Sequence, residues 1–158
     1  MIMLPGERTP NKTGFDALAK SLEKKLDGSS DNLEANGETR EIDNEDFMGS
    51  IRKSPTSIVM FYRTECPYCR QLTPLLDELA EDFKSKVLFA KINIDNVTTA
   101  QEKFDILGVP VVMAFKKGNL VARIEGLRKI EEYESWTDSI HKGLSPMGID
   151  AGPITQID

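Results

Sequence analysis

The sequence contains little cysteine, little histidine and no long apolar run. Among 158 residues there are two cysteines and one histidine. Tetrahedral zinc needs about four nitrogen or sulfur ligands, so one chain of this composition is short of ligands for a zinc site. No segment approaches the roughly 18 consecutive apolar residues of a membrane-spanning helix. We therefore expect neither a bound metal nor insertion into a membrane.

Basic residues are also outnumbered by acidic ones. The chain has 20 lysines and arginines against 26 aspartates and glutamates, a net charge of -6. Nucleic acids and anionic lipids bind basic surfaces, so we expect neither as a partner. The few apolar residues before Pro5 and the charged residues after it do not form a signal or transit peptide. We expect a cytoplasmic protein, in which a close cysteine pair is more typical of redox or metal chemistry than of a structural disulfide.

The chain divides into three regions by composition. Residues 1–38 have the character of a flexible N-terminal extension, in which a thin apolar stripe at 13–27 predicts a short helix and a Gly-, Ser- and Asn-rich linker follows. Residues 39–143 have the length and apolar content of one domain. Residues 144–158 are rich in proline and glycine, which predicts a flexible C-terminal tail that hangs free.

Hydrophobic periodicity predicts an α/β fold for the domain. Apolar residues recur at helical spacing from Leu72 to Phe83, the strongest helical pattern in the chain. The other predicted elements are a helix that begins near Asp46, strands at 57–62, 87–94, 111–115 and 120–124, and helices at 98–107 and 130–140. Residues 116–119 have the composition of a hairpin turn. With a strand before the first helix, the order β-α-β-α-β-α-β-β-α predicts a mixed central sheet with helices on both faces.

The two cysteines lie in a Cys-Pro-Tyr-Cys sequence between a predicted strand and the long helix. Pro67 suits the first helical position and so puts Cys66 at the exposed helix N-terminus, where unpaired N–H groups and the helix dipole favour a thiolate. Cys69 lies one turn deeper and can close a disulfide with Cys66. This pattern predicts that Cys66 attacks a substrate disulfide and Cys69 resolves the intermediate. Half of a zinc site, with His141 as the other candidate ligand, and an inert cysteine pair stay open as alternatives.

Three segments together carry a resemblance to a known family. They read SIVMFYRTECPYCRQLTPLLDELA, LFAKINID and ILGVPVVMAFKKGNLVARIEG. Over residues 40–142 the chain resembles the thioredoxin family, with Pro74 at the position of the proline inside the active-site helix. The resemblance implies a thioredoxin fold and a reductase of protein disulfides that needs no cofactor. It also implies disulfide-containing protein substrates, an electron donor of the thioredoxin-reductase type and a monomeric state.

The resemblance also implies substrate-binding residues. Val109-Pro110 falls at the family's cis-proline, which faces the disulfide, and Val109 would offer its backbone N–H and C=O to an extended substrate segment. Gly126 corresponds to a glycine beside the substrate groove, and Tyr68 stands between the cysteines. The alternative for Pro110 is an ordinary trans proline at the start of a strand.

Three positions are expected to tune the cysteines. They are Pro67, Tyr62, which holds a family aromatic position near the site, and Lys91, which matches a lysine on the neighbouring strand. Plain core packing is the alternative for Tyr62, and a strand lysine that reaches solvent is the alternative for Lys91.

Departures from the family pattern leave two other functions open. Met60 replaces the buried aspartate of the family, and Glu65 replaces a tryptophan and is expected to be a solvated loop charge. The Pro-Tyr spacer looks like that of a glutaredoxin, although the Gly-Gly-x-Asp segment of glutaredoxins is missing. A reductase fed by glutathione is therefore one alternative, and a partner-binding module that uses the N-terminal extension is another.

Overall fold

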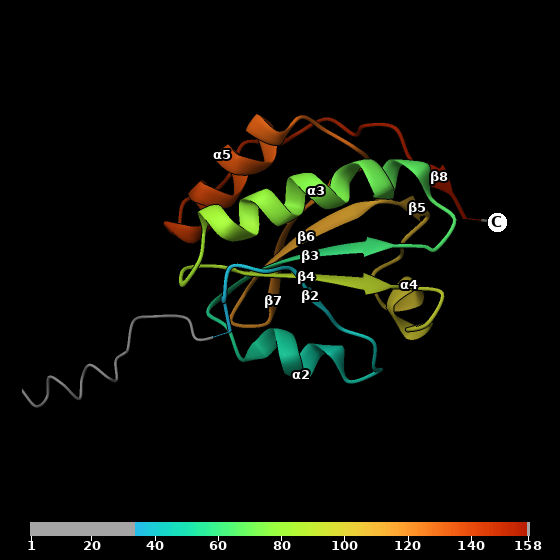
Figure 1. The fold of residues 1–158 in the computed structure, drawn as a ribbon, viewed down its shortest axis with the longest axis horizontal. Coiled ribbons are helices and arrows are strands. Elements are labelled where there is room, and N and C mark those ends of the chain that lie inside the picture. Colours follow the sequence, from blue (N-terminus) through green and yellow to red (C-terminus); the bar gives the residue numbers. More distant parts are fainter. Residues whose placement is uncertain (1–33, 158) are drawn as a thin grey trace, which may run out of the picture. The chain divides into compact units, whose positions relative to one another are not determined.

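Strands β3 and β4 run side by side at the centre of the molecule (Figure 1) in a computed structural model that describes residues 34–157. The predicted helix at 13–27 lies outside the described residues. The elements are β2 (Arg40–Glu41), α2 (Phe47–Arg52), β3 (Thr56–Tyr62), α3 (Pro67–Asp82), β4 (Leu88–Asn93), α4 (Thr99–Lys103), β5 (Gly108–Val109), β6 (Val111–Lys116), β7 (Asn119–Glu125), α5 (Ile130–His141) and β8 (Thr155–Gln156).

The main sheet is mixed, as predicted. Its five strands follow the order β2-β4-β3-β6-β7. Strands β2 and β3 are parallel to β4, whereas β6 is antiparallel to both β3 and β7. A second sheet consists of the two short strands β5 and β8. The helix α3 and the helix α5 lie on one side of the main sheet and α2 lies on the other (Figure 1).

Alternation along the central strands builds a core on each side of the sheet. In β3, Val59 and Phe61 belong to the cluster on the α2 side, whereas Ile58 and Met60 belong to the cluster on the α3 side. Both sides of β4 are also buried, with Lys91 the one half-buried residue of that strand. Helices cover both faces of the sheet, so its central strands have no solvent-facing side.

The predicted hairpin and the last helix are confirmed, and one helix is shorter than expected. Lys117 and Gly118 both have positive φ, 53° and 84°, as a type I′ turn between β6 and β7 requires. The helix predicted at 98–107 ends at Lys103. Asp105 then takes a positive φ of 53°, and Gly108, which directly follows the predicted helix, belongs to β5.

Both predicted boundaries of the domain need correction. Ala35 was assigned to the flexible extension at 1–38, but it is buried and its carbonyl accepts a hydrogen bond from the Ser85 N–H at 2.7 Å. The tail at 144–158 was expected to hang free, but Thr155–Gln156 forms β8 against β5. The folded unit therefore begins at Glu34 and includes the C-terminal segment.

Candidate active site

Cys66 and Cys69 form a disulfide at the start of α3. Cys66 is the N-cap residue with extended backbone angles, φ -149° and ψ 97°, and Pro67 is the first helical residue. The Cys69 N–H donates to the Cys66 sulfur over 3.2 Å. A thiolate formed at Cys66 would keep this donor and would face the positive end of the helix dipole, and both interactions would stabilise its negative charge. Zinc binding is not the state seen here, because the two sulfur atoms are bonded to each other.

The residue before the cis-proline lies beside the Cys66 sulfur. The Val109-Pro110 peptide bond is cis, and the Cys66 sulfur lies 3.8 Å from the Val109 carbonyl oxygen. Both cysteines are buried, Cys66 at 0% and Cys69 at 2% exposure. The expectation that Cys66 is exposed at the helix start is therefore wrong for this structure. Ile157 of the C-terminal segment packs against the cluster that holds both sulfur atoms.

Gly126 lies next to Pro110. Its N–H donates to the Pro110 carbonyl over 2.8 Å, and its own carbonyl accepts a hydrogen bond from the Tyr133 hydroxyl at 2.9 Å. Gly126 has φ +87°, and a Cβ atom there would lie 2.2 Å from the Gly152 carbonyl oxygen. A side chain at Gly126 is excluded both by the backbone conformation and by the C-terminal segment.

The proposed tuning residues Tyr62 and Lys91 share an acidic partner. The Tyr62 hydroxyl donates to Glu41 at 2.8 Å, and the Lys91 Nζ lies 3.9 Å from the same carboxylate and 5.8 Å from the Tyr62 ring. Burial and the hydrogen bond to Glu41 raise the pKa of Tyr62. Because Lys91 lies near the Glu41 carboxylate, the negative charge of Glu41 weakens the electrostatic effect of Lys91 on a thiolate.

The other expected positions differ in exposure. Tyr68 is half-buried against the cluster that contains both cysteines, and Met60 is fully buried. The Glu65 side chain is 91% exposed and lies 3.9 Å from Arg70, so it is the solvated loop charge that the sequence predicted. A charge so exposed has a weak effect on the neighbouring sulfur.

Sequence reasoning missed an aspartate that holds the loop before Cys66. Asp95 accepts hydrogen bonds from the Thr64 N–H at 3.0 Å and from the Arg63 Nε at 2.9 Å. The Thr64 N–H and the Arg63 side chain hold the pKa of Asp95 below its usual value. The available signal was topological. Strands β3 and β4 are parallel, so the residues that follow their carboxyl ends meet at one edge of the sheet.

Comparison with known proteins agrees with this geometry. The sequence model of the family described as Thioredoxin matches residues 38–139. The chain belongs to the thioredoxin family. Thioredoxin from Chlamydia pneumoniae is 38% identical over 90 residues, which are 57% of this chain and 86% of that protein. Thioredoxin from Alicyclobacillus acidocaldarius subsp. acidocaldarius is 30% identical over 97 residues, which are 61% and 92% of the two chains.

A solved structure supports the thioredoxin fold. A mutant thioredoxin from Halobacterium salinarum NRC-1 superposes with a TM-score of 0.61 at 20% identity, and the match covers 72% of this chain and 95% of that one. Family membership and the Cys-x-x-Cys disulfide identify this thioredoxin-family chain as a thiol-disulfide oxidoreductase. Within residues 34–157, no helix is long and apolar enough to cross a membrane.

Proposed function

We propose that this thioredoxin-family protein reduces disulfide bonds in other proteins, with Cys66 as the attacking residue and Cys69 as the resolving residue. The observation that supports this order is the position of Cys66 at the N-cap of α3, with the Cys69 N–H 3.2 Å from its sulfur. This donor and the helix dipole stabilise negative charge on Cys66 and not on Cys69, which lies one turn into the helix.

The proposed reaction transfers two electrons in two exchange steps. The Cys66 thiolate attacks one sulfur of a substrate disulfide, forms a mixed disulfide and releases the other substrate sulfur as a thiolate, which takes up a proton. Cys69 then loses its proton and attacks the Cys66 sulfur, so the second substrate thiol leaves and the Cys66–Cys69 disulfide forms. The substrate disulfide is reduced and the dithiol is oxidised. An electron donor of the thioredoxin-reductase type would restore the dithiol.

The peptide around the substrate disulfide is proposed to bind along Val109. Its carbonyl oxygen lies 3.8 Å from the Cys66 sulfur, so an extended segment paired with Val109 would hold its own sulfur close to Cys66. Pro110 and Gly126, joined by a 2.8 Å hydrogen bond, would border that segment. The half-buried Tyr68, which stands between the two cysteines in the sequence, would add an aromatic contact.

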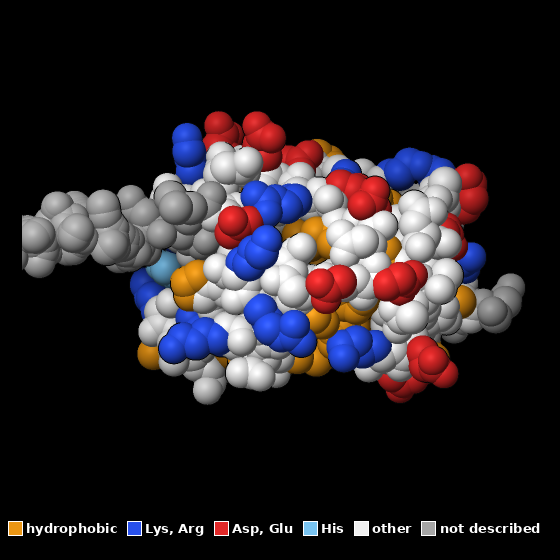
Figure 2. All heavy atoms as spheres, turned by 90° about the horizontal axis from the view of Figure 1, so that it is seen from below, with side chains coloured by type: hydrophobic (Ala, Val, Ile, Leu, Met, Phe, Trp, Pro, Cys, Tyr) orange, Lys and Arg blue, Asp and Glu red, His pale blue; other side chains and the backbone are white. Residues whose placement is uncertain are grey.

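Proteins rather than polyanions are the partners that the surface charge favours. Figure 2 shows the face on which α2 lies, and acidic and basic side chains are interspersed over it. Phosphate-rich ligands bind surfaces with a concentrated positive charge. A cytoplasmic location and a monomeric state remain predictions.

A glutathione-fed reductase is a second candidate, which the Pro-Tyr spacer between the cysteines favours. The two candidates differ in the electron donor that restores the dithiol. Insulin reduction is measured with the oxidised chain and either NADPH with thioredoxin reductase, or NADPH with glutathione and glutathione reductase. We expect turnover with the first system and little with the second. Insulin reduction with the glutathione system and none with thioredoxin reductase would favour the second candidate. A Cys66→Ser, Cys69→Ser double variant is the inactive control.

A further inference from the structure

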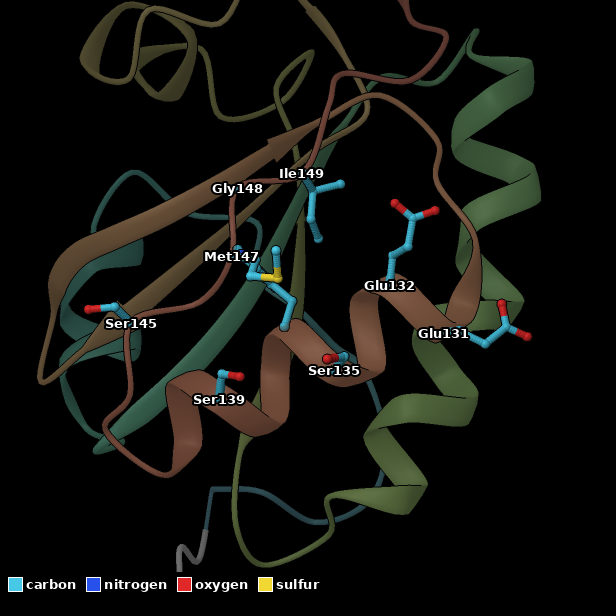
Figure 3. A pocket seen from close by; sticks show the side chains of 9 residues that line it. Glu131, Glu132, Ser135, Ser139, Ser145, Met147, Gly148 and Ile149 are labelled. Carbon is cyan, nitrogen blue, oxygen red and sulfur yellow. The ribbon is translucent and has the colours of Figure 1, made fainter.

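The C-terminal segment follows a defined path across the domain. From Ser145 to Ile149 it runs beside α5, where it borders a pocket of about 460 Å³ (Figure 3). Ile149 packs against the core cluster between the sheet and α3. The segment then continues toward Gly126 and the disulfide.

The segment crosses Gly126 through a contact between two glycines. The Gly152 N–H donates to the Glu125 carbonyl over 2.7 Å, and the Leu127 N–H donates to the Pro153 carbonyl over 3.0 Å. A Cβ atom on Gly152 would lie 2.0 Å from the Leu127 carbonyl oxygen. This crossing therefore holds only while residue 152 has no side chain.

Beyond the crossing, the segment adds a strand to β5. Thr155 pairs with Val109, Gln156 pairs with Gly108, and the strands are antiparallel. The Ile157 N–H donates to the Leu107 carbonyl over 3.1 Å. In an antiparallel ladder every second pair of opposite residues is hydrogen-bonded. Leu107 and Ile157 form one such pair, so Val109 and Thr155, two residues along each strand, form the next. The backbone groups of Val109 are thus already used within the chain.

The end of the segment also packs against the part of the core that holds both cysteines. Ile157 packs against the cluster that contains Cys66, Cys69 and Val109, and Cys66 has 0% exposure. The Ile154 Cδ1 would lie 2.4 Å from a Cβ on Gly108, so this residue too lies directly on β5. A protein disulfide needs access to the Cys66 sulfur and to the edge of β5 at the same time. Strand β8 occupies that edge, and Cys66 is fully buried in the same structure.

We propose that residues 150–157 act as a built-in competitor for the peptide-binding edge of β5, so that a target protein must displace β8 before Cys66 can attack. This inference rests on the proposed function for its target. The preferred ligand is an extended peptide that resembles residues 150–157. It has a glycine where it passes Gly126 and an apolar residue next to Gly108. When only a fraction of the molecules is in the state that can react, the observed rate is that fraction of the rate of the reactive state.

Two glycines of the same segment give a matched pair of variants in the full chain. Gly152→Val forces the segment away from Leu127, whereas a Cβ on Gly148 meets nothing within 4 Å, so Gly148→Val is the control. In a Cys69→Ser background, iodoacetamide alkylation of Cys66 measures exposure of the sulfur. We expect Gly152→Val to raise the alkylation rate by about tenfold and Gly148→Val to change it by less than about twofold.

Equal alkylation rates for Gly152→Val and the parent chain would overturn the proposal. If Gly152→Val does not fold by circular dichroism, Thr155→Pro replaces it, because it removes the N–H that pairs with Val109 at the end of the chain. Insulin reduction by the same variants with both cysteines present separates the two claims. A faster alkylation without any insulin reduction would refute the proposed function and leave the competitor in place.

A peptide of residues 150–157 tests the competition directly. Added to the Gly152→Val variant at about millimolar concentration, which matches a tethered segment, it should restore slow alkylation of Cys66. A scrambled peptide of the same composition is the control. Protection by neither peptide, or by both to the same extent, would show that β5 does not recognise this segment.

Discussion

Replacement of Tyr133 by phenylalanine removes a hydroxyl group that links α5 to the turn at Gly126. Tyr133 is 1% exposed. Its hydroxyl donates to the Gly126 carbonyl over 2.9 Å and accepts a hydrogen bond from the Arg128 N–H at 3.0 Å. Burial raises the pKa of Tyr133 to about 12, so the hydroxyl keeps its proton in ordinary buffers. The Tyr133→Phe substitution therefore removes one hydrogen-bond donor and one hydrogen-bond acceptor together.

The expected cost follows from these two hydrogen bonds. A typical hydrogen bond contributes about 1 kcal/mol net, and the groups left unpaired in a buried place add to this, so we expect a loss of about 2 kcal/mol in the free energy of unfolding. In a domain of this size, that loss lowers Tm by about 8 °C. The variant should not leave a large cavity, because only one oxygen atom is removed.

Urea unfolding of the oxidised protein measures this loss. The transition midpoint should fall while the slope m stays unchanged, since the exposed area on unfolding is the same. Tyr62→Phe is the matched control. Its hydroxyl bonds to the partly exposed Glu41 carboxylate, so its removal should cost less than about 1 kcal/mol. A Tyr133→Phe variant as stable as Tyr62→Phe would refute the reasoning.

Three further predictions concern acid stability, the domain boundary and the redox poise. The folded structure lowers the pKa of Asp95 from its usual 3.8, so the contribution of this carboxylate to the free energy of unfolding is present above pH 3.8 and is lost as the pH falls through the native pKa. In acid titrations, the difference in stability between the parent chain and Asp95→Asn should therefore close below pH 3.8. A chain that begins at Glu34 should keep the parent Tm, whereas one that begins at Gly37 loses the buried Ala35 and should melt lower in calorimetry. With a buried methionine at position 60 and proline after Cys66, the potential against a glutathione buffer should lie near about -240 mV, and a value at or below about -270 mV would contradict this.

Much of the sheet and its helices could be predicted from sequence periodicity. The apolar spacing between Leu72 and Phe83 predicted α3, because a helix buried on one side repeats its apolar positions every three or four residues. The turn at Lys117-Gly118 was predictable because few residues other than glycine take positive φ without cost. Such signals are local, and a single sequence carries them.

The C-terminal strand could not be predicted in the same way. Strand β8 has two residues and is held through backbone hydrogen bonds, which leave no pattern of side chains. The glycines and prolines of residues 146–153 predict a free tail, although Gly152 is required by a close backbone approach. A weak signal was present in Ile149, Ile154 and Ile157, three branched apolar residues that a free tail would leave exposed to solvent. The burial of Cys66 was not predicted either, because the C-terminal segment was predicted to be free.

The cysteine pair was predictable from its motif and the cis-proline beside it from the family resemblance, but the carboxylates that contact the surrounding residues were not. A Cys-x-x-Cys at a strand–helix junction indicates its chemistry without reference to distant residues. The placement of Asp95 under the loop at Thr64, and of Glu41 against Lys91, depends on which strands become neighbours. Single-sequence periodicity does not contain that information.

Trapping of a mixed disulfide tests the proposed division of labour between the two cysteines most directly. The reduced Cys69→Ser and Cys66→Ser variants are incubated with oxidised insulin, and the products are separated without reductant and identified by mass spectrometry. In the proposed mechanism the Cys66 thiolate attacks and Cys69 resolves the intermediate, so Cys69→Ser should accumulate a Cys66–insulin mixed disulfide that dithiothreitol cleaves, and Cys66→Ser should accumulate none. Accumulation in Cys66→Ser alone would contradict the assignment.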